Sequence, residues 1–377
     1  MKNLKKLKMV MLIVVAVIIF GIIVAILFGN KEEKQVSHKD KIKEKIKKEG
    51  TEETDVLPTL IDPITKDSCW CGTFQLVWND MKNKVVKGDV VFTPQVKIAD
   101  NLNKETFTEE MLSEDHYYKT YGLKTLELKK KIEQGIKKKF NQDSDILDDF
   151  DWSEDSLDKN GTRYFFYTML YRKFEFLKKF DKLDKGTFGK EGKDVNYFGI
   201  TSDTNDKVGE QIEVLFYNSE DYFAIVLKTK ENDEVIFYKN PKGNTFMDIY
   251  NNMNKQAALY TGDKSFGNED TFKAPCLQIN LKKNYDEVVN KEFKTNNPKI
   301  PVAIIAKAMQ TVKFSLDEKG GKVKSEAAIE MKENCVVGVE SNLRNFAVDD
   351  TFTLFLREEG KDMPYFAMNV DDISKFQ

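Results

Sequence analysis

Only two histidines, His38 and His116, occur among the 377 residues of this sequence. A zinc site with three histidine ligands is therefore impossible, and a Ser-His-Asp triad would have to use one of these two. His116 lies in an acidic stretch beside two tyrosines, where we expect a surface histidine. The sequence also lacks Gly-x-Ser-x-Gly, His-Glu-x-x-His and glycine-rich phosphate-binding motifs. We therefore predict that the protein is not an enzyme and needs no metal and no cofactor.

Acidic residues cluster at positions 143–159, which suggests a test for calcium binding. The calcium-loop pattern requires glycine at its sixth place, and Gly161 would put the first ligand at Ser156. The pattern fails there, so we predict a solvated acidic loop.

Four cysteines, Cys69, Cys71, Cys276 and Cys335, are few for an extracellular protein. The Cys-Trp-Cys spacing is too tight for an ordinary disulfide or a standard zinc pair. Whether Cys276 and Cys335 form a disulfide stays open at this point.

The charges divide the chain into two unlike parts. Residues 1–50 hold 12 lysines and 5 acidic residues, whereas residues 51–377 hold 47 basic and 57 acidic ones. Because non-specific nucleic-acid binding needs a basic surface, the acidic excess of the larger part argues against a nucleic-acid partner.

Residues 9–28 form an apolar run of 20 residues without a charge, preceded by Lys2, Lys5, Lys6 and Lys8. A helix of this length spans about 30 Å, the thickness of one hydrocarbon core. A cleaved signal peptide is the main alternative, but its apolar part is usually about 7–15 residues. We predict a retained single-pass anchor in the cell membrane, with residues 1–8 in the cytoplasm. Residues 29–56 would form a charged stalk, and residues 57–377 an extracellular domain.

The remaining periodicities indicate an α+β protein with helices early and strands late. Apolar residues spaced near four predict a helix over 124–140, and further helices are expected at 246–259 and 301–310. An aromatic and apolar run predicts a strand at 164–171, and alternating inward and outward residues predict strands at 272–281 and 311–316. Further strands are expected at 212–217, 222–227, 235–238, 352–356 and 365–370.

Several of these segments resemble the serpin family of serine protease inhibitors. Residues 307–310 followed by Asp-Glu-Lys-Gly at 317–320 resemble the strand and turn before the serpin reactive loop. Lys-Ser-Glu-Ala-Ala at 324–328 resembles the hinge of that loop, and residues 346–357 resemble the strand after it, with Thr351 in place of a proline. Residues 166–181 are similar to the central strand of the large serpin sheet. The chain between 95 and 160 is shorter than in ordinary serpins, so the resemblance is to a divergent member shortened in its N-terminal helical region.

The resemblance implies N-terminal helices, a large mixed sheet, a smaller antiparallel sheet and an exposed reactive-type loop, here preceded by one transmembrane helix. In serpins a protease cuts the loop, and the hinge side inserts into the large sheet as a new strand while the acylated protease is carried along. The implied partner is a serine or cysteine protease.

Counting as in the family places the loop hinge at Ser325, Glu326, Ala327 and Ala328 and the scissile bond between Gly338 and Val339. Insertion starting at Ser325 would turn Ser325, Ala327, Ile329 and Met331 inward and Glu326, Ala328, Glu330 and Lys332 outward. Residues 320–323 look like an insertion before this hinge.

Thr168 and Gln310 replace an asparagine and a histidine that hydrogen-bond beneath the opening sheet in serpins. We expect Thr168 and Gln310 to meet as a sheet-opening pair, since their side chains can form the same kind of bond. Two unrelated surface substitutions are the alternative.

Two functions follow from this resemblance. The first is a membrane-tethered, extracellular serpin-like protein that inhibits a protease by loop insertion. The alternative is a non-inhibitory binding or structural module at the cell surface. Lys324 stands where glycine usually permits the hinge turn, and Ile329 and Glu330 replace small residues, which favours the alternative.

Overall fold

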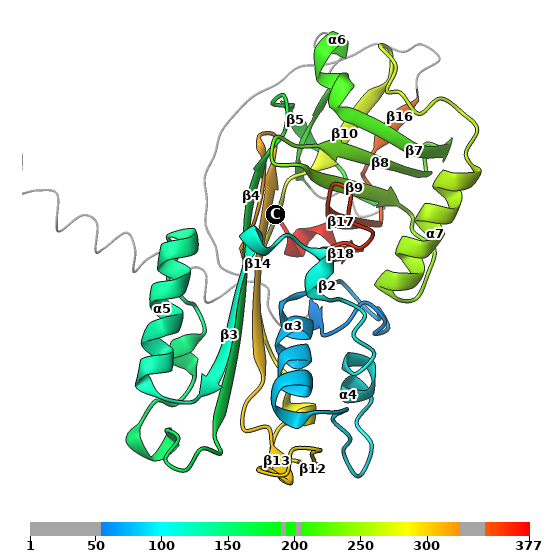
Figure 1. Ribbon diagram of the computed structural model, residues 1–377. Coiled ribbons are helices and arrows are strands. Elements are labelled where there is room, and N and C mark those ends of the chain that lie inside the picture. The colour runs from blue at the N-terminus through cyan, green and yellow to red at the C-terminus, as the bar shows by residue number, and fades with distance from the viewer. Residues whose placement is uncertain (1–53, 190–193, 201–204, 325–343) are drawn as a thin grey trace, which may run out of the picture. The chain divides into compact units, whose positions relative to one another are not determined.

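Strand β4 (Tyr164–Glu175) buries alternate residues on two faces, as a strand between two layers does. The structure is a computed structural model that describes residues 54–189, 194–200, 205–324 and 344–377. Figure 1 shows β4 in the same sheet as β14 (Met309–Asp317), with α5 (Leu126–Phe140) covering one face of this sheet and α3 (Thr73–Asp80) lying against the other. We call these the front and the back face.

The sheet that contains β4 has five strands in the order β11-β14-β15-β4-β3, and all neighbours are antiparallel. Its other strands are β11 (Leu277–Asn284), β15 (Gly320–Lys324) and β3 (Tyr117–Leu123). Residues 164–171 and 311–316 therefore lie in one sheet, as the loop-insertion hypothesis requires.

A seven-stranded mixed sheet forms the main core. Its order is β1-β2-β18-β17-β9-β8-β7, and only β1 and β2 are parallel. The strands are β1 (Asp55–Leu57), β2 (Ser68–Cys71), β7 (Ile212–Ser219), β8 (Tyr222–Lys228), β9 (Asp233–Lys239), β17 (Phe352–Glu358) and β18 (Phe366–Val370).

Two smaller sheets complete the strands. A four-stranded sheet has the order β16-β10-β6-β5, with β10 and β16 parallel, and a two-stranded sheet pairs β12 with β13. These strands are β5 (Asp181–Gly186), β6 (Val195–Ile200), β10 (Thr271–Pro275), β12 (Glu292–Lys294), β13 (Val302–Ile304) and β16 (Asn345–Ala347). The expected α+β class with one large mixed sheet is thus confirmed. Residues 166–181, however, were expected to form the central strand of that large sheet, and instead they contribute β4 to the five-stranded antiparallel sheet.

Helix α5 confirms the predicted helix at 124–140 and shows why it forms there. The side chain of Thr125 accepts a hydrogen bond from the backbone N–H of Leu128, and Asn141 ends the helix with φ of 53°. Leu128, Ile132 and Ile136 are buried against Phe165, Tyr167 and Met169 on the front face of β4. Apart from short 3-10 turns, the other described helices are α3, the π-helical turn η1 (Met81–Val86), α4 (Lys97–Leu102), α6 (Asn205–Val208) and α7 (Phe246–Leu259).

Two expected elements differ from the structure. Residues 301–310 do not form a helix, because 302–304 form β13 and Met309 begins β14, whose pairing with β11 outweighs local helix propensity. Residues 272–281 form two strands in different sheets, β10 and β11, with the break at Cys276.

The predicted anchor at 9–28 and most of the predicted stalk lie outside the described residues. Within residues 54–377, as far as they are described, no helix is long and apolar enough to cross a membrane. Cys69 and Cys71 are buried thiols in β2, and Cys276 is a partly buried thiol, whereas Cys335 lies outside the described residues.

Candidate functional site

Strand β15 lies between β4 and β14 and pairs with both. Gly320 faces Glu175 of β4, and Lys324 faces Tyr171 of β4 and Lys313 of β14. The chain turns into this position at Gly320, where φ is +145° and a Cβ atom would lie 2.3 Å from the carbonyl oxygen of Phe174. Only glycine fits such a turn.

Strand β15 starts earlier in the sequence than the expected start of the inserting segment at Ser325. The strand enters the sheet at Gly320, five residues before Ser325, so residues 320–323 are its first part rather than an insertion before it. The physical reason is Gly320 itself, which supplies the turn that Lys324 was expected to hinder. Val323 is buried in the core on the back face, and Lys322 lies with its Nζ 5.4 Å from the ring centroid of Tyr171.

Beyond Lys324 the two neighbours of β15 continue without a described strand between them. Among the described residues, 164–170 of β4 pair only with β3, and Met309–Val312 of β14 pair only with β11. Their other backbone edges face the same space, which we call the slot. The slot is bounded by residues 164–170 on one side and 306–312 on the other.

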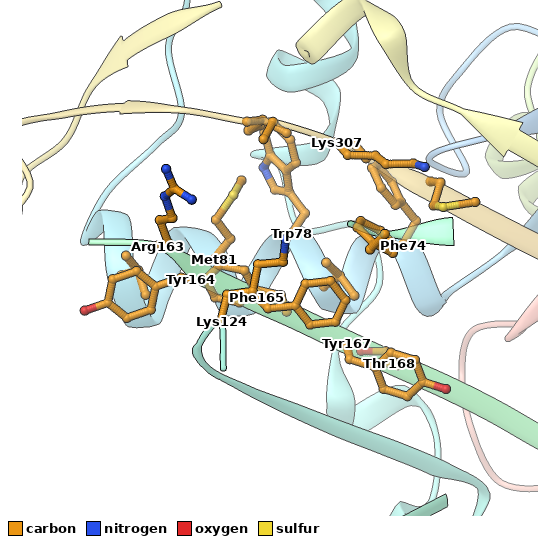
Figure 2. A pocket seen from close by; sticks show the side chains of 18 of the residues that line it. Phe74, Trp78, Met81, Lys124, Arg163, Tyr164, Phe165, Tyr167, Thr168 and Lys307 are labelled. Atoms are coloured by element: carbon orange, nitrogen blue, oxygen red, sulfur yellow. The ribbon is translucent and has the colours of Figure 1, made fainter. Parts of the chain in front are cut away.

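A cavity of about 820 Å³ follows the slot and extends to the helices behind it. Figure 2 shows Phe74, Trp78 and Met81 among the side chains that surround it. Most of the lining is apolar, and the volume lies within the range of sites that bind small molecules or peptide side chains. Further apolar lining residues are Val77, Val85, Phe166, Ile305, Ala306 and Ala308.

Thr168 and Gln310 both line this cavity, one from each bounding strand. The expected hydrogen bond between them is not formed. The Nε2 of Gln310 donates to the carbonyl oxygen of Cys71 and to Oγ1 of Thr73, and its Oε1 accepts from the hydroxyl of Tyr285. Because these bonds occupy Gln310, the buried Oγ1 of Thr168 has no partner among the described residues.

Residues 143–158, here called the acidic strap, contact both sides of the slot on its front face. Asp145 pairs with Lys313 of β14 and Asp149 with Lys282 of β11, each at 2.6 Å. Phe150 packs edge-on against Phe165 of β4, with ring centroids 4.9 Å apart. Ion pairs thus attach the predicted acidic loop to the sheet.

A buried ionic cluster lies at the end of the slot next to β15, which we call its upper end. Arg172, which faces Val323 of β15, donates from Nε to Oδ2 of Asp233 at 2.5 Å and from Nη2 to the carbonyl oxygen of Glu231. The hydroxyl of Tyr365 donates to the other oxygen of Asp233. Burial raises the pKa of Asp233 to about 6, although Arg172 favours its charged form.

His116 and Glu358 adjoin the same cluster. Nη1 of Arg172 lies 3.4 Å from Glu358, whose carboxylate also accepts from Ser113. Burial, and after it the charge of Arg172, lowers the pKa of His116 below its usual value. This cluster joins β4 to β9 and β17, so it holds the top of the five-stranded sheet against the main core.

The other predicted site residues cannot be placed on this framework. Ser325, Glu326, Ala327, Ala328, Gly338 and Val339 lie outside the described residues. Sequence analysis missed Arg172, because a single arginine in an aromatic strand gives no signal of its partner 61 residues away.

Comparisons with known proteins give matches of structure alone. No protein-family model and no curated protein matches the sequence. Similar solved structures include Serpin48 from the insect Tenebrio molitor, with a TM-score of 0.44 and 13% identity over 81% of this chain and 91% of that one. The mouse protein-Z dependent protease inhibitor has a TM-score of 0.46 and 13% identity over 81% and 90%. Human thyroxine-binding globulin complexed with thyroxine has a TM-score of 0.39 and 13% identity over 69% and 76%.

Proposed function

We propose that this chain is a divergent, serpin-like protease inhibitor, anchored in the cell membrane by residues 9–28 with its C-terminal domain outside the cell. Its partner would be a serine or cysteine protease. The observation that carries the proposal is the position of β15, which occupies the upper part of the space between β4 and β14 and leaves the slot below it. The next residues along the chain belong to the segment that resembles a reactive loop.

The driving force of insertion would be the completion of this sheet. A strand in the slot would pair with the backbone edges of β4 and β14 that have no described partner there, and it would bury alternate side chains in the cavity. A cut on the far side of the inserting segment would release it to move, while β15 already holds its first residues in register. Inhibition requires that this movement is faster than hydrolysis of the acyl-enzyme.

The test is incubation of the full chain with a panel of serine and cysteine proteases, followed by a denaturing gel and a thermal melt. A covalent complex that survives denaturation, together with a rise in the melting temperature of the cleaved chain, is expected. Cleavage without a complex and without a rise would contradict the proposal. Cleavage with a rise but no complex would favour the non-inhibitory alternative.

The slot itself supplies one observation in favour of that alternative. Seven residues after Lys324 would bring the chain level with Tyr164, the first residue of β4. If the bond after Gly338 is cut, seven more residues, about 23 Å of extended chain, would separate the sheet from the protease. A linker of this length would hold the protease away from the sheet, so the protease would not be distorted. If the same family count starts at Gly320 instead of Ser325, the scissile bond follows Glu333, close to the end of the slot. A cut after Glu333 would therefore favour inhibition, and a cut after Gly338 the non-inhibitory alternative. Mass spectrometry of the cleaved chain identifies the cut site.

The membrane anchor has its own test. The full chain is expected to stay with membranes after a wash at high pH, and deletion of residues 9–28 is expected to release it. Release of the full chain by the same wash would overturn the anchor and leave the loop proposal untouched.

A further inference from the structure

The turn before β4 contains a motif that the proposed function does not use. Asn160, Gly161 and Thr162 form an Asn-x-Thr sequence, and no other Asn-x-Ser or Asn-x-Thr sequence occurs in the 377 residues. This motif is the acceptor for N-linked glycosylation in domains that enter the secretory pathway. Because so short a motif also occurs by chance, its surroundings in the fold decide whether it can act.

The side chain of Asp158 holds this turn in place. Its Oδ2 accepts a hydrogen bond from the backbone N–H of Gly161 at 2.8 Å. Its Oδ1 accepts from the N–H groups of Thr162 and Arg163, at 2.8 Å and 2.7 Å. Gly161 has φ of +75°, a conformation that glycine adopts easily. Asp158 and Gly161 therefore account for the turn, and the side chains of Asn160 and Thr162 are not needed to form it.

The acceptor side chain is open to solvent. Asn160, Gly161 and Thr162 are all exposed, and a Cβ atom at Gly161 would have no atom within 4 Å. Within the part of the chain that the structure describes, the carboxamide of Asn160 forms no hydrogen bond. An oligosaccharide on its amide nitrogen would therefore displace no packed side chain.

Hydrogen bonds attach the same turn to the end of β3. The backbone N–H of Asp158 donates to the carbonyl oxygen of Lys124, and the N–H of Lys124 donates to the carbonyl oxygen of Arg163, both at 2.8 Å. In Figure 1 these residues lie where β3 ends and β4 begins. Just before Lys124, the side chains of Tyr121 and Leu123 are 39% and 37% exposed.

Tyr121 and Leu123 belong to a larger apolar surface on the back face of the sheet. They pair with Phe166 and Tyr164 of β4, which are partly exposed. The ring of Phe166 stacks with those of Tyr121 and Tyr164, at centroid distances of 5.7 Å and 6.5 Å. We call these four residues the aromatic patch. An exposed apolar patch favours association with other molecules, whereas an attached glycan is bulky and increases solubility.

We infer that Asn160 carries an N-linked oligosaccharide and that this glycan shields the aromatic patch. The inference rests on the proposed extracellular location, since only a translocated domain meets the transferase that recognises the motif. The amide nitrogen of Asn160 forms a bond with the anomeric carbon of an oligosaccharide carried on a polyprenyl diphosphate. The bond from that carbon to the diphosphate oxygen breaks, and the lipid diphosphate leaves with the electron pair. The nitrogen loses one proton, and nothing is oxidised or reduced.

Translation of the full chain in the presence of endoplasmic-reticulum microsomes tests the site. The wild type is expected to migrate more slowly on a denaturing gel. Peptide N-glycosidase should remove this shift and leave an aspartate at position 160, which mass spectrometry detects. Asn160→Gln and Thr162→Ala should abolish the shift, whereas Thr162→Ser should retain it, because serine also supplies the hydroxyl of the motif. A wild type without any shift would overturn the inference.

A second acceptor motif separates failure of the site from failure of the extracellular location. Glu220→Thr converts Asn218-Ser219-Glu220, an exposed turn between β7 and β8, into an Asn-x-Thr sequence. A glycan at Asn218 of this variant with none at Asn160 would overturn the inference and leave the location standing. No glycan at either position would overturn both. Glycans at both positions are the expected result.

The shielding has a separate measurement. Hydroxyl-radical labelling of the purified full chain, read by mass spectrometry, compares Tyr121 and Leu123 before and after enzymatic removal of the glycan. Their labelling is expected to increase after removal. Leu259 of α7, which is 66% exposed and lies outside the aromatic patch, is the control and should not change. Equal labelling of Tyr121 and Leu123 in both forms would overturn the shielding role.

Discussion

Arg172 of β4 and Asp233 of β9 form an ion pair with 2.5 Å between Nε and Oδ2, and their side chains are 1% and 0% exposed. The pair lies level with Val323 of β15, whose side chain is buried in the core. It therefore joins the five-stranded sheet to the main core at the upper end of the slot.

We predict that Arg172→Met destabilises the protein by about 3–5 kcal/mol, because Asp233 would remain buried without its counter-ion. The double variant with Asp233→Asn should recover most of this loss, since the amide oxygen still accepts from Tyr365. Urea unfolding of the full chain measures both values. Equal losses in the single and the double variant would show that the pair is not coupled.

His116 gives a prediction for pH. The pKa of His116 is lowered in the folded protein by burial and by Arg172, so the unfolded chain binds more protons below pH 6.5. Stability should therefore fall as the pH decreases through 6.5, and His116→Gln should reduce this fall. Melting temperatures of both proteins at pH 7.5 and pH 5.5 measure the difference. An identical change in melting temperature in both proteins would exclude His116 as a cause of the loss of stability at low pH.

Gly320 is predicted to be the less replaceable of the two glycines of β15. In Gly320→Ala the new Cβ would meet the main chain of Phe174 at a backbone conformation that alanine avoids, so we expect β15 to leave its place and stability to fall by more than about 3 kcal/mol. Gly161→Ala is the control, because Gly161 also has a positive φ, of +75°, but no atom lies within 4 Å. Its cost should be about 1 kcal/mol. If both variants lose the same stability, the contact with Phe174 does not position β15.

The elements of this fold were predictable where the sequence pattern is local. The spacing of Leu128, Ile132 and Ile136 predicts α5, and the aromatic and apolar run over 164–171 predicts most of β4. Residues 301–310 show the limit, because their alanines favour a helix in isolation while pairing with β11 makes the end of this segment a strand.

The site was predictable only in part, for a similar reason. Thr168 and Gln310 were predicted to meet, and both line one cavity, but they do not form the expected hydrogen bond. The partners of Gln310, namely Cys71, Thr73 and Tyr285, come from distant parts of the chain and carry no motif. The start of β15 was misplaced because Lys-Ser-Glu-Ala-Ala resembles a hinge more closely than Gly-Gly-Lys-Val does.

Thr168 and Gln310 are predicted to contribute unequally to stability. Gln310→Met would leave several buried groups without partners and should destabilise the protein by about 2–4 kcal/mol. Thr168→Val keeps the shape and removes a buried hydroxyl that has no partner among the described residues, so it should be neutral or stabilise by about 1 kcal/mol. Thermal unfolding of the uncut chain measures both. A similar loss in the two variants would indicate that Thr168 has a partner after all.

The acidic strap is predicted to control how fast the slot can be filled rather than whether it is filled. Asp145 and Asp149 pair with Lys313 and Lys282 on the far side of the slot, and partly exposed pairs of this kind contribute about 0.2–1 kcal/mol each. Asp145→Asn with Asp149→Asn should therefore barely change the melting temperature of the uncut chain.

The rate of the stability gain after cleavage should respond more strongly. If the strap must detach before a strand can enter, loss of about 1 kcal/mol of its attachment would accelerate the gain about fivefold. Asp143→Asn is the control, since Asp143 pairs with Lys137 of α5 and not with the strands that bound the slot. High salt should accelerate wild type in the same way and leave the double variant unchanged. An unaltered rate in the double variant would show that the strap stays in place while the slot fills.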